Sequence, residues 1–384
     1  MQQINTSSPG ILIFAEGLLG DALVLTPAIR AIKEYYKTSF LSILLFKRLK
    51  VNDSPGHAVI KESEFKGAAE VFLNNPYVDL VLELDRSALR SLNIFKRISS
   101  EIKNINILRR NKYDIIICTF PKDRFAIYSY FSGAKIRVGQ KKQPLGFLLN
   151  TKADITENEY NVIRYFGKLL EPIDIKINDF STYFNITKEN EQEAEEFLKK
   201  HGLENSKNIV GIHPGASMPD RTWPAEYFAE LINYLRLNVI SDVILFYNDF
   251  DVPFINEIKK YLKAEIIEAK PRSLSEMGAL FKKCSICVTN NSGPRHLAAA
   301  VGTRTLGLLF KHDEKKWGIY DTELHPYMES QKPCSICPPG KCNAVIPGNE
   351  KYSSICMRDI APDDVIKKVI SMLEHKLIYQ KNGT

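Results

Sequence analysis

Short apolar runs separated by helix-like segments constrain the fold of this chain more than any other feature. The first run covers residues 11–14, and apolar residues then recur at helical spacing over residues 22–36. Pro27 is expected near the first turn of that helix, where proline is tolerated. Strands that alternate with helices predict a parallel sheet covered on both faces. Further strands of the same series are expected at residues 41–46, 78–84, 114–119 and 135–138.

A second series of the same kind follows the first. The charged segment 188–201 is expected to be the surface helix that opens it, and Ser273 with Glu276 has the spacing of a capping box. Because one core rarely grows past about 250–300 residues, the chain of 384 residues suggests two domains. The expected strands cover residues 208–213, 242–247, 264–268, 285–288 and 305–309, and the expected helices residues 224–235, 273–283, 294–301 and 361–377.

The domain boundary is expected near residue 185, which gives an N-terminal domain at residues 1–185 and a C-terminal domain at 186–358. Residues 311–358 are expected to be loop-like, and residues 330–358 are the Cys-rich part of that loop. Residues 359–384 are expected to form a C-terminal helix and tail that pack across the domain interface.

Composition narrows the class of protein. The chain is 44% hydrophobic and 25% charged, which is an ordinary globular composition. Its net charge of +7 is spread along the chain, which speaks against a nucleic-acid partner and favours an anionic small molecule, a phosphorylated substrate or a membrane surface. Lysine-rich, solvated helix faces are the plain alternative.

No run reaches the roughly 18–20 apolar residues of a membrane span, and residues 1–10 lack the basic start of a signal peptide. We therefore expect a cytoplasmic protein, with peripheral contact to the inner face of the inner membrane as an option.

Two loops in the second series have the composition of an anion-binding site. In open α/β sheets, ligands bind at the carboxyl ends of strands, against helix N-termini. The segment 290–296 reads NNSGPRH at such a strand–turn–helix junction, where backbone N–H groups and the helix dipole favour an anion. The alternative is that Asn290 or Asn291 only caps a helix. The groups considered for donor binding are Asn291, Ser292, Gly293, Arg295 and His296.

The other loop reads HPGAS over residues 213–217, and Arg221 follows it in the segment RTWP. Ser217 offers a hydroxyl, and the Arg221 guanidinium suits bidentate contact with phosphate. On neighbouring strands, the two loops would contact a diphosphate from two sides. The alternative for Arg221 is an ordinary surface residue, and Trp223 is expected to pack in the core.

A third loop, in the first series, contains Gly17 and Gly20 and ends in Asp21. The spacing is not that of a dinucleotide-binding fingerprint. Asp21 is either a helix N-cap, which is common for aspartate, or a general base.

The three loops in this order resemble glycosyltransferase family 9, the ADP-heptose:lipopolysaccharide heptosyltransferases. The matching segments are GLLGDALVLTPAIRAIK, HPGASMPDRTWPAEYFAELI and NNSGPRHLAAAVGT. The resemblance implies an α/β fold of the GT-B class, with two Rossmann-like doubly wound domains and a cleft between them. It also implies inverting transfer of a heptose from ADP-heptose to a lipopolysaccharide inner-core acceptor, with no metal required. The N-terminal domain would bind the acceptor and the C-terminal domain the nucleotide sugar.

By position, the resemblance makes Asp21 the catalytic base, Arg221 the phosphate-binding cation, and Ser292 and Gly293 the phosphate-binding backbone, with His296 beside it. The chain departs from the family at two places. Arg221 stands where many members have lysine, which keeps the charge. Asn291 stands where the family usually has aspartate, near the sugar, and offers one acceptor oxygen instead of two.

Four cysteines gather near the C-terminus, at positions 334, 337, 342 and 356. Four thiolates suit structural zinc or iron, and some relatives of the family carry Cys-ligated iron in this region. Reduced thiols and disulfides are the alternatives. The residues concerned are Cys334, Cys337, Cys342 and Cys356.

Three other functions stay open on these residues. A protein acceptor of the autotransporter type is one, and a nucleotide-sugar 2-epimerase, which shares the GT-B layout, is another. A sugar-nucleotide-binding subunit without activity is the third.

Overall fold

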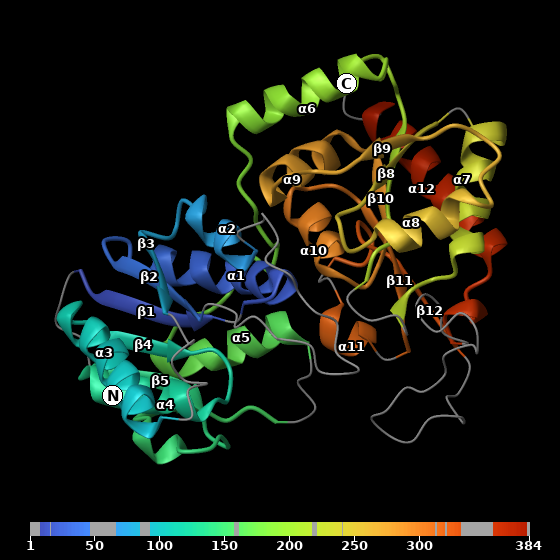
Figure 1. Cartoon of the computed structure of the whole chain (residues 1–384). Helices are drawn as coiled ribbons and strands as arrows, with labels where there is room; N and C mark the ends of the chain where they lie inside the picture. The colour runs from blue at the N-terminus through green and yellow to red at the C-terminus, as the bar shows by residue number, and fades with distance from the viewer. Residues whose placement is uncertain are drawn as a thin grey trace. The chain divides into compact units, whose positions relative to one another are not determined.

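The computed structural model describes residues 8–15, 17–46, 67–84, 93–156, 161–216, 221–239, 241–311, 313–318, 321–331 and 356–381. Contacts between Cα atoms divide the chain into two units, Met1–Asn185 and Ile186–Thr384 (Figure 1). The division falls at the position where the sequence pattern places the domain boundary. Each unit consists of a parallel sheet covered by helices.

The sheet of the first unit has six strands in the order β3-β2-β1-β4-β5-β6, and every neighbouring pair is parallel. Ile11 of the central strand β1 lies between Leu41 and Ile115 of its two neighbours. The chain leaves β1 toward one edge and returns to β4 on the other side, so the strand order reverses between β1 and β4. The strands are β1 (Gly10–Ala15), β2 (Phe40–Phe46), β3 (Leu80–Leu84), β4 (Ile115–Cys118), β5 (Ile136–Gln140) and β6 (Thr151–Ala153).

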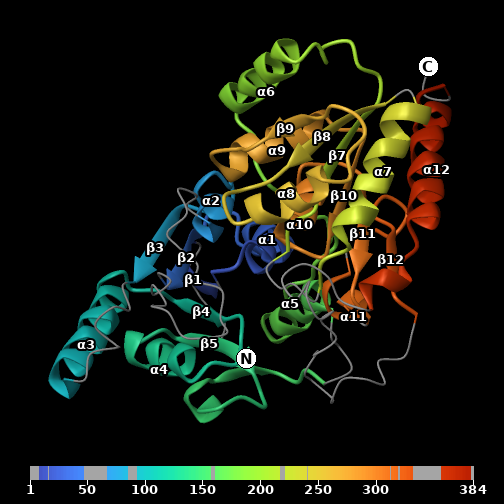
Figure 2. The ribbon, with the colours of Figure 1, turned by 45° about the vertical axis from the view of Figure 1, so that its right-hand side comes forward.

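Helices cover both faces of this sheet. One group packs around α1, and in the other α3 packs against α4. Figures 1 and 2 show α3 and α4 side by side on one face of the sheet, with α1 and α2 on the opposite face. The helices are α1 (Leu19–Tyr35), α2 (Ala68–Leu73), α3 (Ile94–Arg110), α4 (Asp123–Ser132) and α5 (Val162–Leu170).

The helix α1 begins earlier than expected, so Pro27 lies inside it and not in its first turn. A proline there has no N–H to donate to the carbonyl four residues earlier, which belongs to Leu23. The hydroxyl of Thr26 donates to that carbonyl instead, at 2.7 Å, and accepts from the backbone N–H of Tyr183 at 2.9 Å. The helix therefore keeps its hydrogen bonding across the proline and is joined to a distant segment at the same point.

The second unit repeats the architecture. Its six strands have the order β12-β11-β10-β7-β8-β9, again with all pairs parallel, and the strand order reverses between β7 and β10. The predicted doubly wound fold is thus confirmed in both units. The strands are β7 (Ile209–His213), β8 (Asp242–Phe246), β9 (Ile267–Ala269), β10 (Ile286–Asn290), β11 (Thr305–Leu309) and β12 (Tyr327–Glu329).

The strand β12 and the helix α11 (Asp313–Trp317) lie in the segment 311–358, which the sequence pattern assigned to a loop. That expectation was wrong for these residues. Both elements are short: β12 has three residues and α11 has five, and β12 is the edge strand next to β11 in the sheet that the described residues form. Such short elements leave too few residues for a periodic signal.

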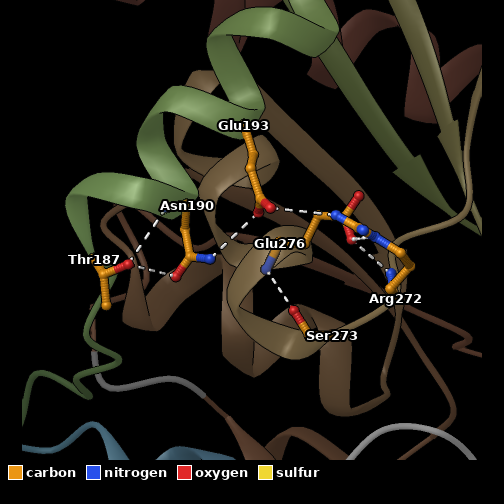
Figure 3. A network of polar contacts seen from close by, with 6 residues as sticks. All are labelled: Thr187, Asn190, Glu193, Arg272, Ser273 and Glu276. Carbon is orange, nitrogen blue, oxygen red and sulfur yellow. Dashed lines mark hydrogen bonds and ion pairs between the residues drawn. The ribbon is translucent and has the colours of Figure 1, made fainter.

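The helices of the second unit include α6 (Lys188–Lys200), the charged helix expected to open it, and α9 (Leu274–Lys283). Figure 3 shows how the two meet through Glu193 and Arg272, whose charged groups lie 3.3 Å apart. Ser273 caps α9 as predicted, since its hydroxyl accepts from the N–H of Glu276 at 3.0 Å. The carboxylate of Glu276 accepts from the N–H of Arg272, at 2.8 Å. The other helices are α7 (Ala225–Asn238), α8 (Val252–Lys259), α10 (Gly293–Ala300) and α12 (Pro362–Lys381).

The C-terminal helix α12 packs against α7 and places Val365, Val369 and Leu373 in the same core as the fully buried Trp223. The indole N–H of Trp223 donates to the carbonyl of Ile360 at 2.9 Å, just before α12. The predicted packing role of Trp223 is confirmed. Among the helices that the structure describes, none is both long and apolar enough to cross a bilayer.

Candidate active site

The two anion-type loops of the second unit lie side by side. One follows β7 and the other follows β10, and these strands are neighbours, with His213 level with Thr289. They flank the position where the strand order reverses, which is where open α/β sheets bind their ligands. The structure therefore brings the two loops together as expected.

Asn290 joins these two loops. It is the last residue of β10 and is fully buried. Its amide donates to the carbonyl of Pro214 at 2.6 Å, and its side-chain oxygen accepts from the N–H of Trp223 at 3.0 Å. Asn290 therefore holds the HPG turn and the RTWP segment together by hydrogen bonds, and it is not the N-cap of α10.

The HPG turn is also shaped from behind by Asp251, which precedes α8. A Cβ atom at Gly215 would lie 2.1 Å from a carboxylate oxygen of Asp251, so any other residue there would force the Asp251 side chain to move. His213 is buried, and its Nε2 lies 3.7 Å from the same carboxylate. Burial lowers the pKa of His213, and the negative charge of Asp251 acts in the opposite direction.

Asp313, at the start of α11, connects the two loops at a second point. One of its carboxylate oxygens lies 3.4 Å from Arg221 Nη1 and accepts from the amide of Asn291 at 3.1 Å. The Arg221 side chain is about one third exposed (34%), while Asp313 is buried. The guanidinium of Arg221 is therefore held by a buried carboxylate, while about a third of the side chain stays exposed, as suits a group that binds phosphate.

Arg295 lies entirely inside this unit. Its Nη1 donates to the side-chain oxygen of Asn291 at 3.4 Å, and a Cβ atom at Gly307 would come within 2.5 Å of its Nε. Burial lowers the pKa of Arg295 to about 10, although Asp313 and Glu314 favour its charged form. With no exposed surface, Arg295 supports Asn291 and is not placed to contact a ligand directly in this state.

His296 is buried beside Arg295 and packs against Trp317 at a centroid distance of 6.2 Å. Burial lowers its pKa to about 3, and the charge of Arg295 and the nearby His325 act in the same direction. His325 has a pKa lowered to about 4, mainly by burial, and its Nδ1 lies 3.1 Å from the hydroxyl of Thr305. At neutral pH both imidazoles are uncharged, so His296 is a neutral hydrogen-bonding group.

The start of α10 has the features of an anion site. Ser292 is its N-cap residue but makes no side-chain cap bond, and Pro294 lies in its first turn. The Ser292 hydroxyl instead points to the carbonyl of Asn290, at 3.4 Å. First-turn N–H groups have no partner inside a helix. Near Ser292 and Gly293 they are therefore directed toward the space beyond β10, where a phosphate would be stabilised by the helix dipole.

Asp21 lies in the first unit, in the first turn of α1 at the carboxyl end of β1. The N-cap of α1 is Leu18, so the alternative that Asp21 caps the helix is wrong. Gly17 precedes the helix, and Gly20 lies within its first turn. Asp21 is only 8% exposed. It stands next to the reversal of strand order between β1 and β4, the ligand-binding edge of this sheet.

Several expected site residues lie outside the described part of the chain. They are Ser217 in the HPG loop and three of the four clustered cysteines. The fourth, Cys356, is buried, and so are Cys118, Cys284 and Cys287. Within the described ranges, no group of three or more His, Cys, Asp or Glu side chains could hold a metal ion. The residues outside description are Ser217, Cys334, Cys337 and Cys342.

Two residues of the site could not be identified from the sequence. Asp313 stands in a segment expected to be a loop. The one sequence feature that points to it is its position a few residues after β11, the strand beside β10. Asn290 was considered only as a cap, because its two partners lie 76 and 67 residues away in the chain. Both act through long-range contacts that no local pattern indicates.

Comparison with known proteins places this architecture in a family. Lipooligosaccharide heptosyltransferase 2 of Campylobacter jejuni subsp. jejuni serotype O:2 is 24% identical to this chain over 381 residues, or 95% of this chain and 98% of the relative. The crystal structure of the glycosyl transferase family 9 protein from Veillonella parvula DSM 2008 superposes with a TM-score of 0.73 at 20% identity, covering 96% and 97% of the two chains. The structure of E. coli ADP-heptose lps heptosyltransferase II gives 0.67 at 18% identity, covering 96% and 99%.

At these identities the two structures show the fold, and they confirm the GT-B class expected from the sequence. The family model of glycosyltransferase family 9 (heptosyltransferase) matches residues 102–344, more than half of the chain. With the paired loops at the strand reversal of the second sheet and the loop of Asp21 at that of the first, this match shows that the chain belongs to glycosyltransferase family 9, the heptosyltransferases.

Proposed function

We propose that this chain transfers a heptose from ADP-heptose to a lipopolysaccharide inner-core acceptor, with inversion at the anomeric carbon and with no metal in the chemical step. The observation that carries the proposal is the joined pair of loops after β7 and β10, held together by Asn290 and Asp313. A diphosphate is the ligand that suits a helix N-terminus beside a partly exposed arginine. The names of the family and of its relatives supply the sugar and the acceptor.

The first step is removal of a proton from the acceptor hydroxyl. We assign this step to the carboxylate of Asp21, at the ligand-binding edge of the first sheet. The acceptor oxygen then forms a bond to the anomeric carbon while the bond from that carbon to the diphosphate oxygen breaks. The electron pair of the broken bond leaves with ADP, and the proton stays on Asp21 until water removes it.

The leaving group needs stabilisation because its negative charge grows as the bond breaks. We assign this to Arg221 and to the backbone N–H groups at Ser292 and Gly293, with Ser217 as a further hydroxyl donor. Preorganised donors of this kind typically contribute on the order of 10²–10³ in rate each. Asn291 faces the sugar in this proposal, while the neutral imidazole of His296 lies beside the phosphates. Arg295 acts indirectly, by holding Asn291 through the bond at 3.4 Å.

The proposal places the reaction in the cytoplasm, at the inner face of the inner membrane, where the lipid-linked acceptor is within reach of the enzyme. A structural zinc or iron on the cysteine segment has no support among the described residues. Elemental analysis of the purified chain for zinc and iron decides that separate point, since stoichiometric metal would support such a site.

The test of the catalytic assignment is the substitution Asp21→Asn, which keeps the shape of the side chain and removes its basicity. Transfer should fall by roughly 10²–10⁴, the usual contribution of a general base. Binding of ADP, measured by calorimetry, should stay unchanged, because the proposed diphosphate groups belong to the other unit.

Near-normal transfer by the Asp21→Asn variant would remove Asp21 from the role of base. Interconversion of nucleotide sugars without any acceptor would contradict the transferase assignment itself and support an epimerase. Transfer to a protein acceptor in preference to the inner core would contradict the acceptor that we propose.

A further inference from the structure

The helix α3 of the first unit contains several apolar residues but buries few of its side chains. Only two of its 17 residues, Asn104 and Leu108, are buried, and both lie in its C-terminal half. The side chains of its first two turns are exposed, apart from one that is partly buried. Figure 2 shows α3 on the outer side of the sheet of this unit, with α4 beside it.

The exposed surface of these turns is apolar. Ile94, Phe95, Ile98 and Ile102 are 52%, 80%, 50% and 53% exposed. Residues 94, 98 and 102 are spaced by four, and residue 95 adjoins them, so the side chains form one stripe along the helix. Single exposed apolar residues are ordinary on protein surfaces, but a continuous stripe of them marks an interaction site.

The helix that carries the stripe has an excess of basic residues. α3 carries five Lys and Arg side chains and one acidic residue, Glu101. The carboxylate of Glu101 is occupied, because it pairs with Arg124 of α4 at 3.1 Å and accepts from the hydroxyl of Tyr128. The field at the stripe is therefore positive. The basic residues are Lys96, Arg97, Lys103, Arg109 and Arg110.

We propose that the stripe Ile94–Phe95–Ile98–Ile102 docks α3 on the surface of an anionic lipid bilayer. An exposed helix with an apolar stripe and flanking basic residues is the form that binds in the plane of a membrane interface. The apolar side chains enter the boundary between headgroups and acyl chains, and the lysine and arginine side chains contact lipid phosphates. A protein partner would also cover apolar surface, but the one-sided charge favours the lipid.

The position of the stripe connects membrane docking with the proposed reaction. In a parallel sheet, the helix that follows each strand starts at the carboxyl edge of the sheet. The stripe occupies the start of α3, after β3, and Asp21 occupies the start of α1, after β1. Both therefore lie at the same edge of one sheet. A bilayer held at α3 would present a lipid-linked sugar acceptor beside Asp21, and in this respect the inference rests on the proposed function.

The experiment is flotation of the full-length chain with vesicles, in the absence of donor and acceptor. Vesicles of phosphatidylcholine and phosphatidylglycerol in equal parts should bind the protein, and phosphatidylcholine vesicles should bind it more weakly. The double variant Phe95→Ser, Ile98→Ser should lose roughly tenfold or more in affinity for the anionic vesicles. The double variant Lys96→Gln, Arg97→Gln should lose about fivefold for each cation removed, and added salt should weaken wild-type binding.

Two control variants match these changes in the second unit. Leu237 and Tyr261 are 61% and 47% exposed, and Leu237→Ser with Tyr261→Ser should leave vesicle binding unchanged. Lys199→Gln with Lys200→Gln on α6 is the control for charge. The substituted side chains are exposed, so all variants should keep the wild-type melting temperature.

Failure of the wild-type chain to bind anionic vesicles, or equal losses in the controls, would overturn the proposal. Equal binding to both kinds of vesicle would overturn the role of charge. Transfer to a core oligosaccharide freed of its lipid separates this inference from the proposed function. The α3 variants should retain that transfer in full, whereas its absence in the wild-type chain would contradict the function and leave the vesicle result intact.

Discussion

At the scale of single residues, the site explains why asparagine stands at position 291. Its amide donates to the buried carboxylate of Asp313, and its oxygen accepts from Arg295. An aspartate at position 291 could serve Arg295 but would place a second carboxylate against Asp313. Position 291 therefore needs a hydrogen-bond donor for the carboxylate of Asp313, which lies 22 positions later in α11.

This match predicts the effect of Asn291→Asp. Two carboxylates in contact repel each other and the anionic donor, so affinity for ADP should fall on the order of tenfold. The double variant Asn291→Asp, Asp313→Asn exchanges the two groups, restores the donor–acceptor pair and should recover most of the loss. Calorimetric titration with ADP measures both. Asn291→Ala is the control, since it removes the amide without adding charge and should cost less than Asn291→Asp.

A result in which Asn291→Asp binds ADP as the wild type does would disprove the repulsion. A double variant weaker than Asn291→Asp alone would show that Asp313 is needed for Arg221 and not for Asn291.

At the scale of elements, the helix α1 depends on one hydroxyl. Thr26 donates to the carbonyl that Pro27 leaves without its usual donor, and it accepts from the N–H of Tyr183. The side chain is buried, so removing the hydroxyl leaves polar backbone groups without a partner. α1 also carries Asp21, which means that the same helix holds the candidate base and depends on this contact.

The substitution Thr26→Val keeps the shape and removes both hydrogen bonds. It should destabilise the first unit by about 1–3 kcal/mol, which lowers its melting temperature by roughly 2–4 °C per kcal/mol. Differential scanning calorimetry measures the change. Thr26→Ser keeps the hydroxyl and should lose much less. Equal losses in the two variants would mean that the methyl group and not the hydroxyl is what matters.

At the scale of the whole molecule, the buried histidines of the second unit make its stability depend on pH. His296 and His325 have pKa values lowered to about 3 and about 4, mainly by burial. The unfolded chain, with histidine pKa values near 6.5, binds more protons than the folded unit between those values. Stability therefore rises with pH over this window, is fully present above about 6.5 and is lost as the pH falls through it.

The expected loss on going from neutral pH to about pH 5 is on the order of 2 kcal/mol for each histidine. Hydrogen exchange of the peptides covering β10 and β11 at the two pH values reports it directly. His325→Gln should reduce the pH dependence without abolishing it, because His296 and His213, whose pKa values burial also lowers, remain. The exchange rates must first be corrected for the pH dependence of the intrinsic rate. If the corrected rates show no loss of protection at low pH, the buried histidines are not the cause of a pH-dependent stability.

The sequence by itself determined the class of the fold and the places of the loops. Alternating apolar runs and helical segments predicted two parallel α/β domains, and both sheets confirm it. Junctions such as HPG and NNSGP were also found from sequence, because glycine, proline and small polar residues mark strand–turn–helix junctions by local chemistry. Local signals were less reliable for ends of elements, as the early start of α1 and the short α11 and β12 show.

Only the tertiary structure decided which of these residues work together. The strand order places β7 beside β10 and so brings the loops that follow these two strands into contact. Asn290 reaches across 67 and 76 positions, and Tyr183 reaches Thr26 across 157. Burial shows that Arg295 supports Asn291 and does not contact a ligand directly, and the exposure of apolar side chains on α3 is what the docking proposal rests on. Such contacts depend on how distant segments pack, and the spacing of residues along the chain does not show which distant segments will pack together.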